Sequence, residues 1–204
     1  MKITLDMLQA KKACQPGIDL FIATYGESAE YQDILDFIAD SHTEYANWLL
    51  NEFGSDGATK IITEQPTTNN VFAAGNLEIK IDLVVKGHIK AGGRIEAEEG
   101  IKAGWGIRAG KGIEAGWGIE AGEVIEVGRG IKAGEGIEAE GGIKAGGGIK
   151  AKLTISVRLR ILVGLINWRL PIASEQTVTC SKLVSGTVAL GTLVETGQVE
   201  EVDK

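Results

Sequence analysis

The sequence predicts a mainly β protein: a triangular parallel β-helix, or solenoid, of hexapeptide repeats with about five coils, a small N-terminal α-helical domain and C-terminal β strands. Three observations carry this prediction. A large aliphatic residue recurs at every sixth position from Leu77 to Ile161. A second apolar column, mostly alanine, follows two residues later, and the residue between the columns is charged along most of the repeat. Self-similarity at a short fixed period indicates a stacked array.

Each hexad reads as a very short strand followed by a bend. Residues two apart on an extended chain share a face, so the Ile and Ala columns point inward and the intervening Lys or Glu points to water. Glycine-rich steps such as Gly104-Trp105-Gly106 supply the corners of a triangular coil. A long helix is disfavoured because each glycine costs about 1 kcal/mol relative to alanine. Collagen is excluded because it needs glycine at every third residue.

Residues 1–57 are predicted to form an acidic helical domain. Four short amphipathic stretches are expected to be helices, the second over residues 17–25, with Gly54 ending the last. Capping residues are expected before the first, third and fourth of them: Thr4, Ser28, and either Ser41 or Thr43.

The remaining boundaries follow from composition and period. Residues 58–74 are expected to be a linker, residues 75–164 the solenoid, and residues 165–204 a C-terminal cap, a β-hairpin and a candidate dimerisation region. Trp168 is expected to cover the open end of the apolar column, since a last coil otherwise exposes its core and unpaired strand groups. Ser185-Gly186 is expected to be the hairpin turn.

The net charge of −7 resides in the N-terminal part. Residues 1–70 carry 11 acidic and 4 basic side chains, whereas residues 87–152 carry 10 of each. Direct nucleic-acid binding is not expected, since it requires a basic stripe. No apolar run is long enough to predict a membrane span, and the first residues do not resemble a secretory signal. With two distant cysteines, a reduced cytoplasmic protein is the simplest interpretation.

Residues that carry chemistry are few. His88 lies at a corner of an early hexad, and hexapeptide solenoids include acyltransferases with a histidine at a coil junction; a surface corner residue is the favoured interpretation. Cys14 has no CxxC or histidine neighbour, so a buried helical thiol is expected. No catalytic residue, cofactor or metal site is predicted, and the chain is not expected to be an enzyme.

Two groups of residues are candidates for contact with a partner protein. Trp105 and Trp117 occupy corner positions, and exposed tryptophans are enriched at interface hot spots. The alternative is that each packs over a neighbouring corner glycine. Being 12 residues apart, they belong to different edges of a triangular coil. The second group is acidic and lies in the helical domain: Asp33, Asp36 and Asp40.

Two segments resemble known proteins. The Gly-Ile-Lys/Glu-Ala-Gly-Trp/Glu array, with Arg158-Leu159-Arg160-Ile161 and Asn167-Trp168-Arg169-Leu170-Pro171 after it, resembles uncharacterised hexapeptide-repeat proteins of bacteriophages, prophages and other mobile elements. The opening segment, residues 8–17 with Phe21 and Tyr25-Gly26, resembles a short helical module at the start of small phage-associated proteins. More distantly, the array is similar to bactofilins, cytoskeletal β-helices that polymerise end to end.

The resemblance implies a function that involves binding rather than catalysis. We expect a protein-binding solenoid, encoded by a phage or mobile element, that binds and inhibits a host protein in the bacterial cytoplasm. A component of CRISPR or restriction defence is the expected target, and the acidic head would compete for its nucleic-acid-binding surface. A homo-oligomer, with a dimer favoured, is also expected. The alternatives are a self-assembling bactofilin-like scaffold and, less favoured, a hexapeptide-repeat acyltransferase.

Overall fold

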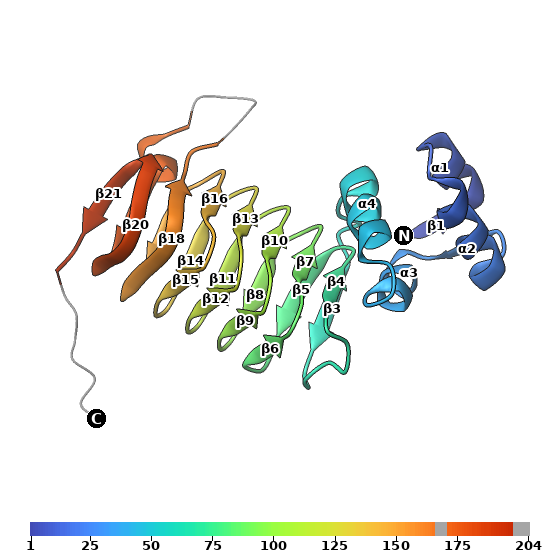
Figure 1. The fold of residues 1–204 in the computed structure, drawn as a ribbon, viewed down its shortest axis with the longest axis horizontal. Helices are drawn as coiled ribbons and strands as arrows, with labels where there is room; N and C mark the ends of the chain where they lie inside the picture. The colour runs from blue at the N-terminus through green and yellow to red at the C-terminus, as the bar shows by residue number, and fades with distance from the viewer. Residues whose placement is uncertain (166–170, 198–204) are drawn as a thin grey trace.

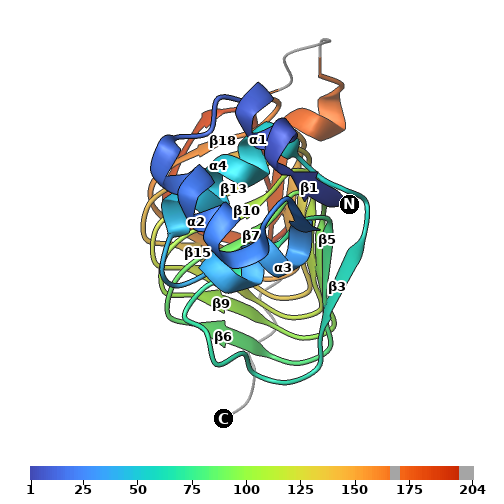
Figure 2. The ribbon, with the colours of Figure 1, turned by 90° about the vertical axis from the view of Figure 1, so that its right-hand side faces the viewer.

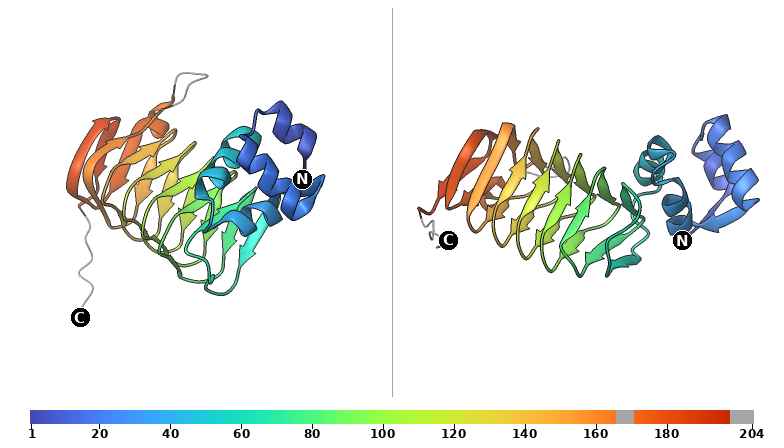
Figure 3. Two further views of the ribbon diagram at one scale, coloured as in Figure 1. Left: turned by 45° about the vertical axis from the view of Figure 1, so that its right-hand side comes forward. Right: turned by 60° about the horizontal axis from the view of Figure 1, so that its bottom comes forward.

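The computed structural model describes residues 1–165 and 171–197 of the chain. A small head of helices sits at one end of a long stack of short strands (Figure 1). The C-terminal strands lie at the opposite end of the stack, as two further views show (Figure 3). The predicted mainly β solenoid with an N-terminal helical part is therefore confirmed.

The head combines helices with a small β ladder. Its elements are β1 (Lys2–Thr4), α1 (Leu5–Ala10), α2 (Gln15–Tyr25), β2 (Ser28–Glu30), α3 (Tyr31–Ile38) and α4 (Thr43–Phe53). Thr4 caps α1 as predicted, because its Oγ1 accepts the Met7 N–H at 3.3 Å. The expectation for Ser28 is wrong: it lies in β2, which pairs antiparallel with β1, so Glu30 precedes α3. Gly54 ends α4 with φ 63°, as predicted. At the start of α4 the capping position is occupied by His42, not by Ser41 or Thr43 as predicted.

From Asn76 to Ala151 the solenoid contains one strand per hexad, whereas a longer strand, Thr154–Leu162, spans two hexads. Its elements are β3 (Thr59–Ile62), β4 (Val71–Ala73), β5 (Asn76–Ile79), β6 (Leu83–Val85), β7 (Ile89–Ala91), β8 (Ile95–Ala97), β9 (Ile101–Ala103), β10 (Ile107–Ala109), β11 (Ile113–Ala115), β12 (Ile119–Ala121), β13 (Ile125–Val127), β14 (Ile131–Ala133), β15 (Ile137–Ala139), β16 (Ile143–Ala145), β17 (Ile149–Ala151), β18 (Thr154–Leu162), the 3₁₀ turn η1 (Ala173–Gln176), β19 (Thr177–Cys180), β20 (Lys182–Leu190) and β21 (Thr192–Glu195).

Eighteen residues make one coil in the regular part of the stack. Ile107 pairs in parallel with Ile125, and Ile113 with Ile131, so equivalent hexads lie directly above one another. One face is an eight-stranded sheet, and the other two faces merge into an eleven-stranded sheet because the long β18 crosses a corner. Viewed from the head, the coils superimpose in a closed outline (Figure 2).

The solenoid has about seven turns rather than the five predicted. Residues 58–74 were expected to be a linker, but they contribute β3 and β4, which pair in parallel with β5 and β7. The predicted hairpin is also wrong. β20 pairs in parallel with β18, and β21 in parallel with β19, so the C-terminal strands continue the coil. Gly186 lies inside β20 with φ 96° instead of forming a hairpin turn.

The C-terminal coils keep the inward apolar column with a shorter spacing. Val178, Leu183, Val188 and Leu193 recur at every fifth position and all contact the solenoid core. A five-residue step still delivers one inward side chain to each face, which is why these strands join the stack. Trp168, the predicted cap, lies outside the described residues.

Burial follows the predicted columns. Every sixth-position residue from Leu77 to Ile161 is at most 2% exposed. The corners are so tight that a Cβ at Gly134 would overlap the carbonyl oxygen of Gly116 in the preceding coil. Within the described residues, no helix is long and apolar enough to cross a membrane.

The charged columns form the ladders that an 18-residue coil predicts. Arg108 lies between Lys90 and Glu126 on one face, and its Nη2 is 2.5 Å from a Glu126 carboxylate oxygen. Lys102 pairs with Glu120, and Lys132 with Glu114, on the other two faces. These exposed pairs make the surface hydrophilic, but each adds less than about 1 kcal/mol to the free energy of unfolding.

Candidate functional site

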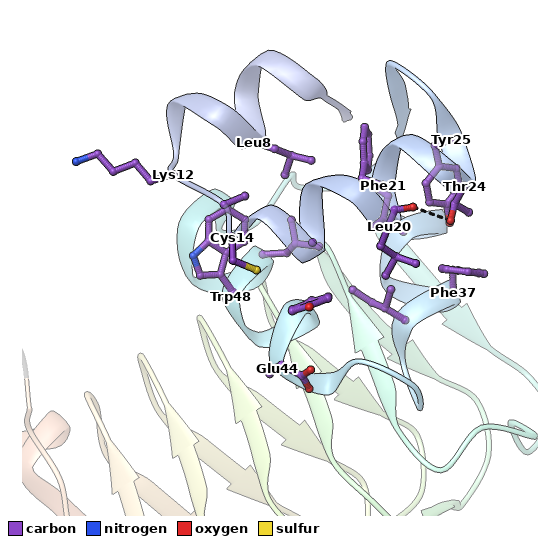
Figure 4. A pocket seen from close by; sticks show the side chains of 16 residues that line it. Leu8, Lys12, Cys14, Leu20, Phe21, Thr24, Tyr25, Phe37, Glu44 and Trp48 are labelled. Atoms are coloured by element: carbon purple, nitrogen blue, oxygen red, sulfur yellow. Dashed lines mark hydrogen bonds between the residues drawn. The ribbon is translucent and has the colours of Figure 1, made fainter.

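The head contains an apolar groove of about 320 Å³. It runs between α2, α3 and α4, on the side of the head shown in close view (Figure 4). Its lining is mostly aliphatic and aromatic and includes Leu20, Phe21, Phe37, Tyr45 and Trp48. Concave, mostly apolar surfaces of this kind are the usual places where proteins bind ligands and partner helices.

Local sequence determines how α2 begins beside the groove and which residues of α3 are buried. Pro16 lies in the first turn of α2, where a missing N–H costs nothing. Gly17 follows, and a Cβ there would stand 3.3 Å from Cys14 Sγ and 4.0 Å from the Tyr45 ring. On α3, the stripe that begins with Tyr31 is directed into the head core. Phe37 is outside that stripe and is 51% exposed.

Aromatic rings form one wall of the groove. The Phe21 and Tyr25 rings are 5.7 Å apart, and the Tyr25 and Phe37 rings meet edge to face at 5.9 Å. Phe37 therefore has one edge packed and the remainder open to solvent. Half-packed aromatic side chains beside a groove are typical anchors for a partner protein.

Acidic residues dominate the electrostatics of the head. Lys11 of the head is 3.6 Å from Glu52, and Lys60 of the first coil is 2.5 Å from Asp36, whereas Lys12 lines the groove and has no ion pair among the described residues. At the groove, burial raises the pKa of Tyr25, and the nearby carboxylates of Asp33 and Asp36 raise it further. Two carboxylates therefore lie near the aromatic wall, while the groove lining itself contains one basic and one acidic residue, Lys12 and Glu44. A positively charged amphipathic segment matches an apolar floor with acidic surroundings.

Cys14 lines the groove and is exposed, contrary to the buried thiol predicted. The residue immediately precedes α2 rather than lying inside a helix, which explains its accessibility. The other cysteine, Cys180, is buried in the solenoid, and burial raises the pKa of its thiol. A thiol reagent is thus expected to modify Cys14 first, which makes Cys14 a reporter of groove occupancy.

The three predicted acidic contacts have different environments. Asp40 accepts four hydrogen bonds, from the backbone N–H and side-chain amide of Asn69 and of Asn70, at 2.8 to 3.1 Å. Asp36 binds Lys60. Both carboxylates thereby join the head to the first coil. The side chain of Asp33, in the first turn of α3, makes no such contact with the described solenoid.

The two predicted tryptophan contacts are exposed, at 52% for Trp105 and 50% for Trp117. They lie on different corners, as expected. The backbone N–H of Trp105 donates to the Gly87 carbonyl in the preceding coil, and that of Trp117 donates to the Glu99 carbonyl. Trp105 packs edge to face on His88, with ring centroids 5.1 Å apart. Neither tryptophan belongs to the groove in the head.

The His88 side chain links two neighbouring coils of the solenoid. Its Nδ1 accepts the Gly106 N–H at 3.1 Å, which ties two coils together. Burial lowers the pKa of His88, and the adjacent Lys90 lowers it further. The folded protein therefore favours a neutral ring with one nitrogen already bonded. In the described part of the chain, no three His, Cys, Asp or Glu residues form a group that could hold a metal ion.

Sequence reasoning missed the role of Phe37 and Trp48 in lining the groove. A usable signal was present in α3, where Phe37 is an aromatic residue beside, not on, the buried stripe. Comparisons with known proteins do not bear on the site: no family model, no curated protein and no solved structure matches the chain.

Proposed function

We propose that this chain is a non-enzymatic binding protein whose helical head holds a positively charged amphipathic segment of a partner protein. The groove between α2, α3 and α4 is the binding site, and the solenoid is a rigid stalk. The observation that carries the proposal is the half-exposed Phe37 beside an apolar groove in the acidic part of the chain.

The magnitudes fit a moderate, specific interaction. Fully burying a large apolar side chain is worth about 1.5–3 kcal/mol, so covering the exposed half of Phe37 contributes roughly 1 kcal/mol. Partner side chains that fill the groove add comparable terms. Acidic surroundings raise the association rate of a basic partner more than its final affinity. Because association costs about 4–15 kcal/mol of lost freedom, we expect a dissociation constant no tighter than about micromolar, or roughly −8 kcal/mol.

The proposed partner is a host protein that itself binds nucleic acid. Such proteins carry basic helices and surfaces, which match the acidic head. Occupying that surface would inhibit the partner. The resemblance to phage and mobile-element proteins favours a component of bacterial defence, of the CRISPR or restriction type, as the target.

The alternative functions have less support. Growth of a bactofilin-like filament needs two open ends, but the head covers the first coil: Phe72 and Ala74 are buried in the head core. Acyl transfer needs a histidine that is free to take a proton, whereas His88 Nδ1 accepts a backbone N–H.

Affinity capture from a bacterial lysate tests the proposal when variants are compared. The wild-type chain, Phe37→Glu and Trp117→Glu are each immobilised. We expect one basic protein to be captured by the wild type and by Trp117→Glu, and to be lost with Phe37→Glu. Binding of that protein should also slow modification of Cys14 by a thiol reagent. Capture that depends on Trp117 and not on Phe37 would refute the groove.

A further inference from the structure

The two ends of the solenoid differ in how they are covered. At the N-terminal end, Gln32 of α3 donates to the Phe72 carbonyl at 2.9 Å and accepts the Ala74 N–H at 2.9 Å. Lys60 Nζ donates to the same Phe72 carbonyl at 3.3 Å. The edge of β4 is therefore bonded by Gln32 of the head and by Lys60 of β3, and Phe72 and the adjacent Ala74 enter the head core, although β3 ends the eight-stranded sheet without a further strand partner in the described part of the chain.

The C-terminal end is open in the described part of the chain. β21 ends the eight-stranded sheet, and β20 pairs only with β18, so the outer edges of both strands have no strand partner there. The inward residues of this last coil, Leu183, Val188 and Leu193, are only partly buried. In the preceding coil the equivalent positions Ile155, Ile161 and Val178 are 0% exposed.

We infer that two copies of this chain associate through their C-terminal coils, tail to tail, into a closed dimer with the heads at opposite ends. An open solenoid end presents an apolar centre inside a triangle of strand edges, and a second copy presents the same shape. A two-fold axis brings each edge against an edge of the partner, which is an isologous contact. Unpaired edges readily form such contacts.

Charge supports a second copy as the occupant. Between residues 177 and 197 the charged side chains are Lys182 and Glu195, one of each sign. Two copies of this coil do not repel each other, although residues 198–204 add three acidic side chains and one basic side chain at the same end of the sequence. The acidic heads would repel each other, but tail-to-tail association separates them by two solenoids, or about 65 Å at a coil spacing of roughly 4.8 Å. That distance is many Debye lengths at physiological salt.

The covered N-terminal end limits the assembly to two copies. A filament would need the first coil to stack on another chain, yet the head covers β4 there: Phe72 and Ala74 are buried in the head core and the Phe72 carbonyl is bonded to Gln32 and Lys60. This inference does not depend on the proposed function, because the groove lies in the head, at the far end from the C-terminal strands (Figure 1).

Light scattering after size exclusion, at about 50 µM, is the first test. We expect twice the chain mass of 21.6 kDa. Leu193→Lys places a charge in the apolar centre and should give a monomer, whereas the adjacent outward Val194→Lys should remain a dimer. The dimer should also persist in a chain that ends at Gly197. A monomeric wild type would overturn the inference, and so would a wild type that dimerises only after residues 198–204 are removed.

Spin-label distances test the geometry without altering the apolar centre. Labels on Cys14 of the two copies should be too far apart to couple, whereas labels on Val194→Cys in a Cys14→Ser background should be close. A short Cys14–Cys14 distance, or mass that keeps growing with concentration, would contradict the closed tail-to-tail dimer.

Discussion

Replacing Asp40 with alanine should loosen the head from the solenoid. The Asp40 carboxylate accepts backbone N–H bonds from Asn69 at 2.8 Å and from Asn70 at 2.9 Å, in addition to both side-chain amides. Asn70 is only 7% exposed, so its groups cannot all turn to water. Its Oδ1 also accepts the His88 N–H at 2.7 Å, which extends the contact into the second coil.

The expected cost of Asp40→Ala is about 3 kcal/mol. A hydrogen bond to a charged group contributes roughly 1.5–3 kcal/mol net, but Asp40 is exposed, so we take about 1 kcal/mol for each backbone bond and about 1 kcal/mol for leaving the Asn70 amide unsatisfied. The exposed Asn69 amide can rebind water, so we count the two backbone bonds and the Asn70 amide. Asp33→Ala, in the first turn of the same helix, removes only a helix-dipole interaction of about 0.5 kcal/mol and is the matched control.

Hydrogen exchange of the α3 amides measures this difference directly, since it reports local opening. Exchange should be faster by roughly two powers of ten in Asp40→Ala and by less than about threefold in Asp33→Ala. Burial alone would raise the pKa of Asp40, but the four hydrogen bonds outweigh it and lower the pKa. The stabilisation is therefore present above the unfolded-state pKa and is lost as the pH falls through the folded value. Equal exchange rates in the two variants would refute the role of Asp40.

Three further predictions concern the solenoid. Gly134→Ala should destabilise the stack by several kcal/mol, because the added Cβ would overlap a carbonyl of the preceding coil. Gly118→Ala, whose Cβ would have 3.5 Å of clearance, should cost less than about 1 kcal/mol, and the thermal unfolding midpoints of the two variants measure the difference. The lowered pKa of His88 means that the unfolded chain binds the proton more readily, so stability should fall as the pH drops below about 6.5, and His88→Asn should reduce that loss. Glu126→Gln breaks the ion pair with Arg108 but should lower the unfolding free energy by less than about 1 kcal/mol, with the difference shrinking in 1 M salt.

The regular coils could be predicted because their aliphatic, charged and glycine residues all recur with the same six-residue period. An unbroken aliphatic column from Leu77 to Ile161 fixes the inward face, the coil length and the charged ladders at once. The first and last coils were not predicted because their inward apolar residues are not spaced six residues apart. β3 and β4 are separated by a polar loop, and the C-terminal coils use a five-residue step that resembles alternating strands joined by a turn.

The head was predictable in its helices and not in its contacts. In the sequence, Asp36 and Asp40 resemble ordinary exposed acidic residues. Their partners Lys60 and Asn70 come from the first coil, and no local sequence pattern predicts that pairing. Phe37 could be singled out as an aromatic residue outside the buried stripe. Whether it bordered a groove depended on where α2 and α4 pack, which is tertiary information.

Calorimetric titration with two designed peptides tests the binding role of the head most directly. Each is an 18-residue helix with leucine on one face; the other face carries lysine in the first peptide and glutamate in the second. We predict saturable, micromolar binding of the lysine peptide to the full-length protein, weaker at high salt and abolished by Phe37→Glu. The glutamate peptide should not bind. Equal heats for both peptides, or binding that survives Phe37→Glu, would contradict an apolar groove in acidic surroundings as the binding site.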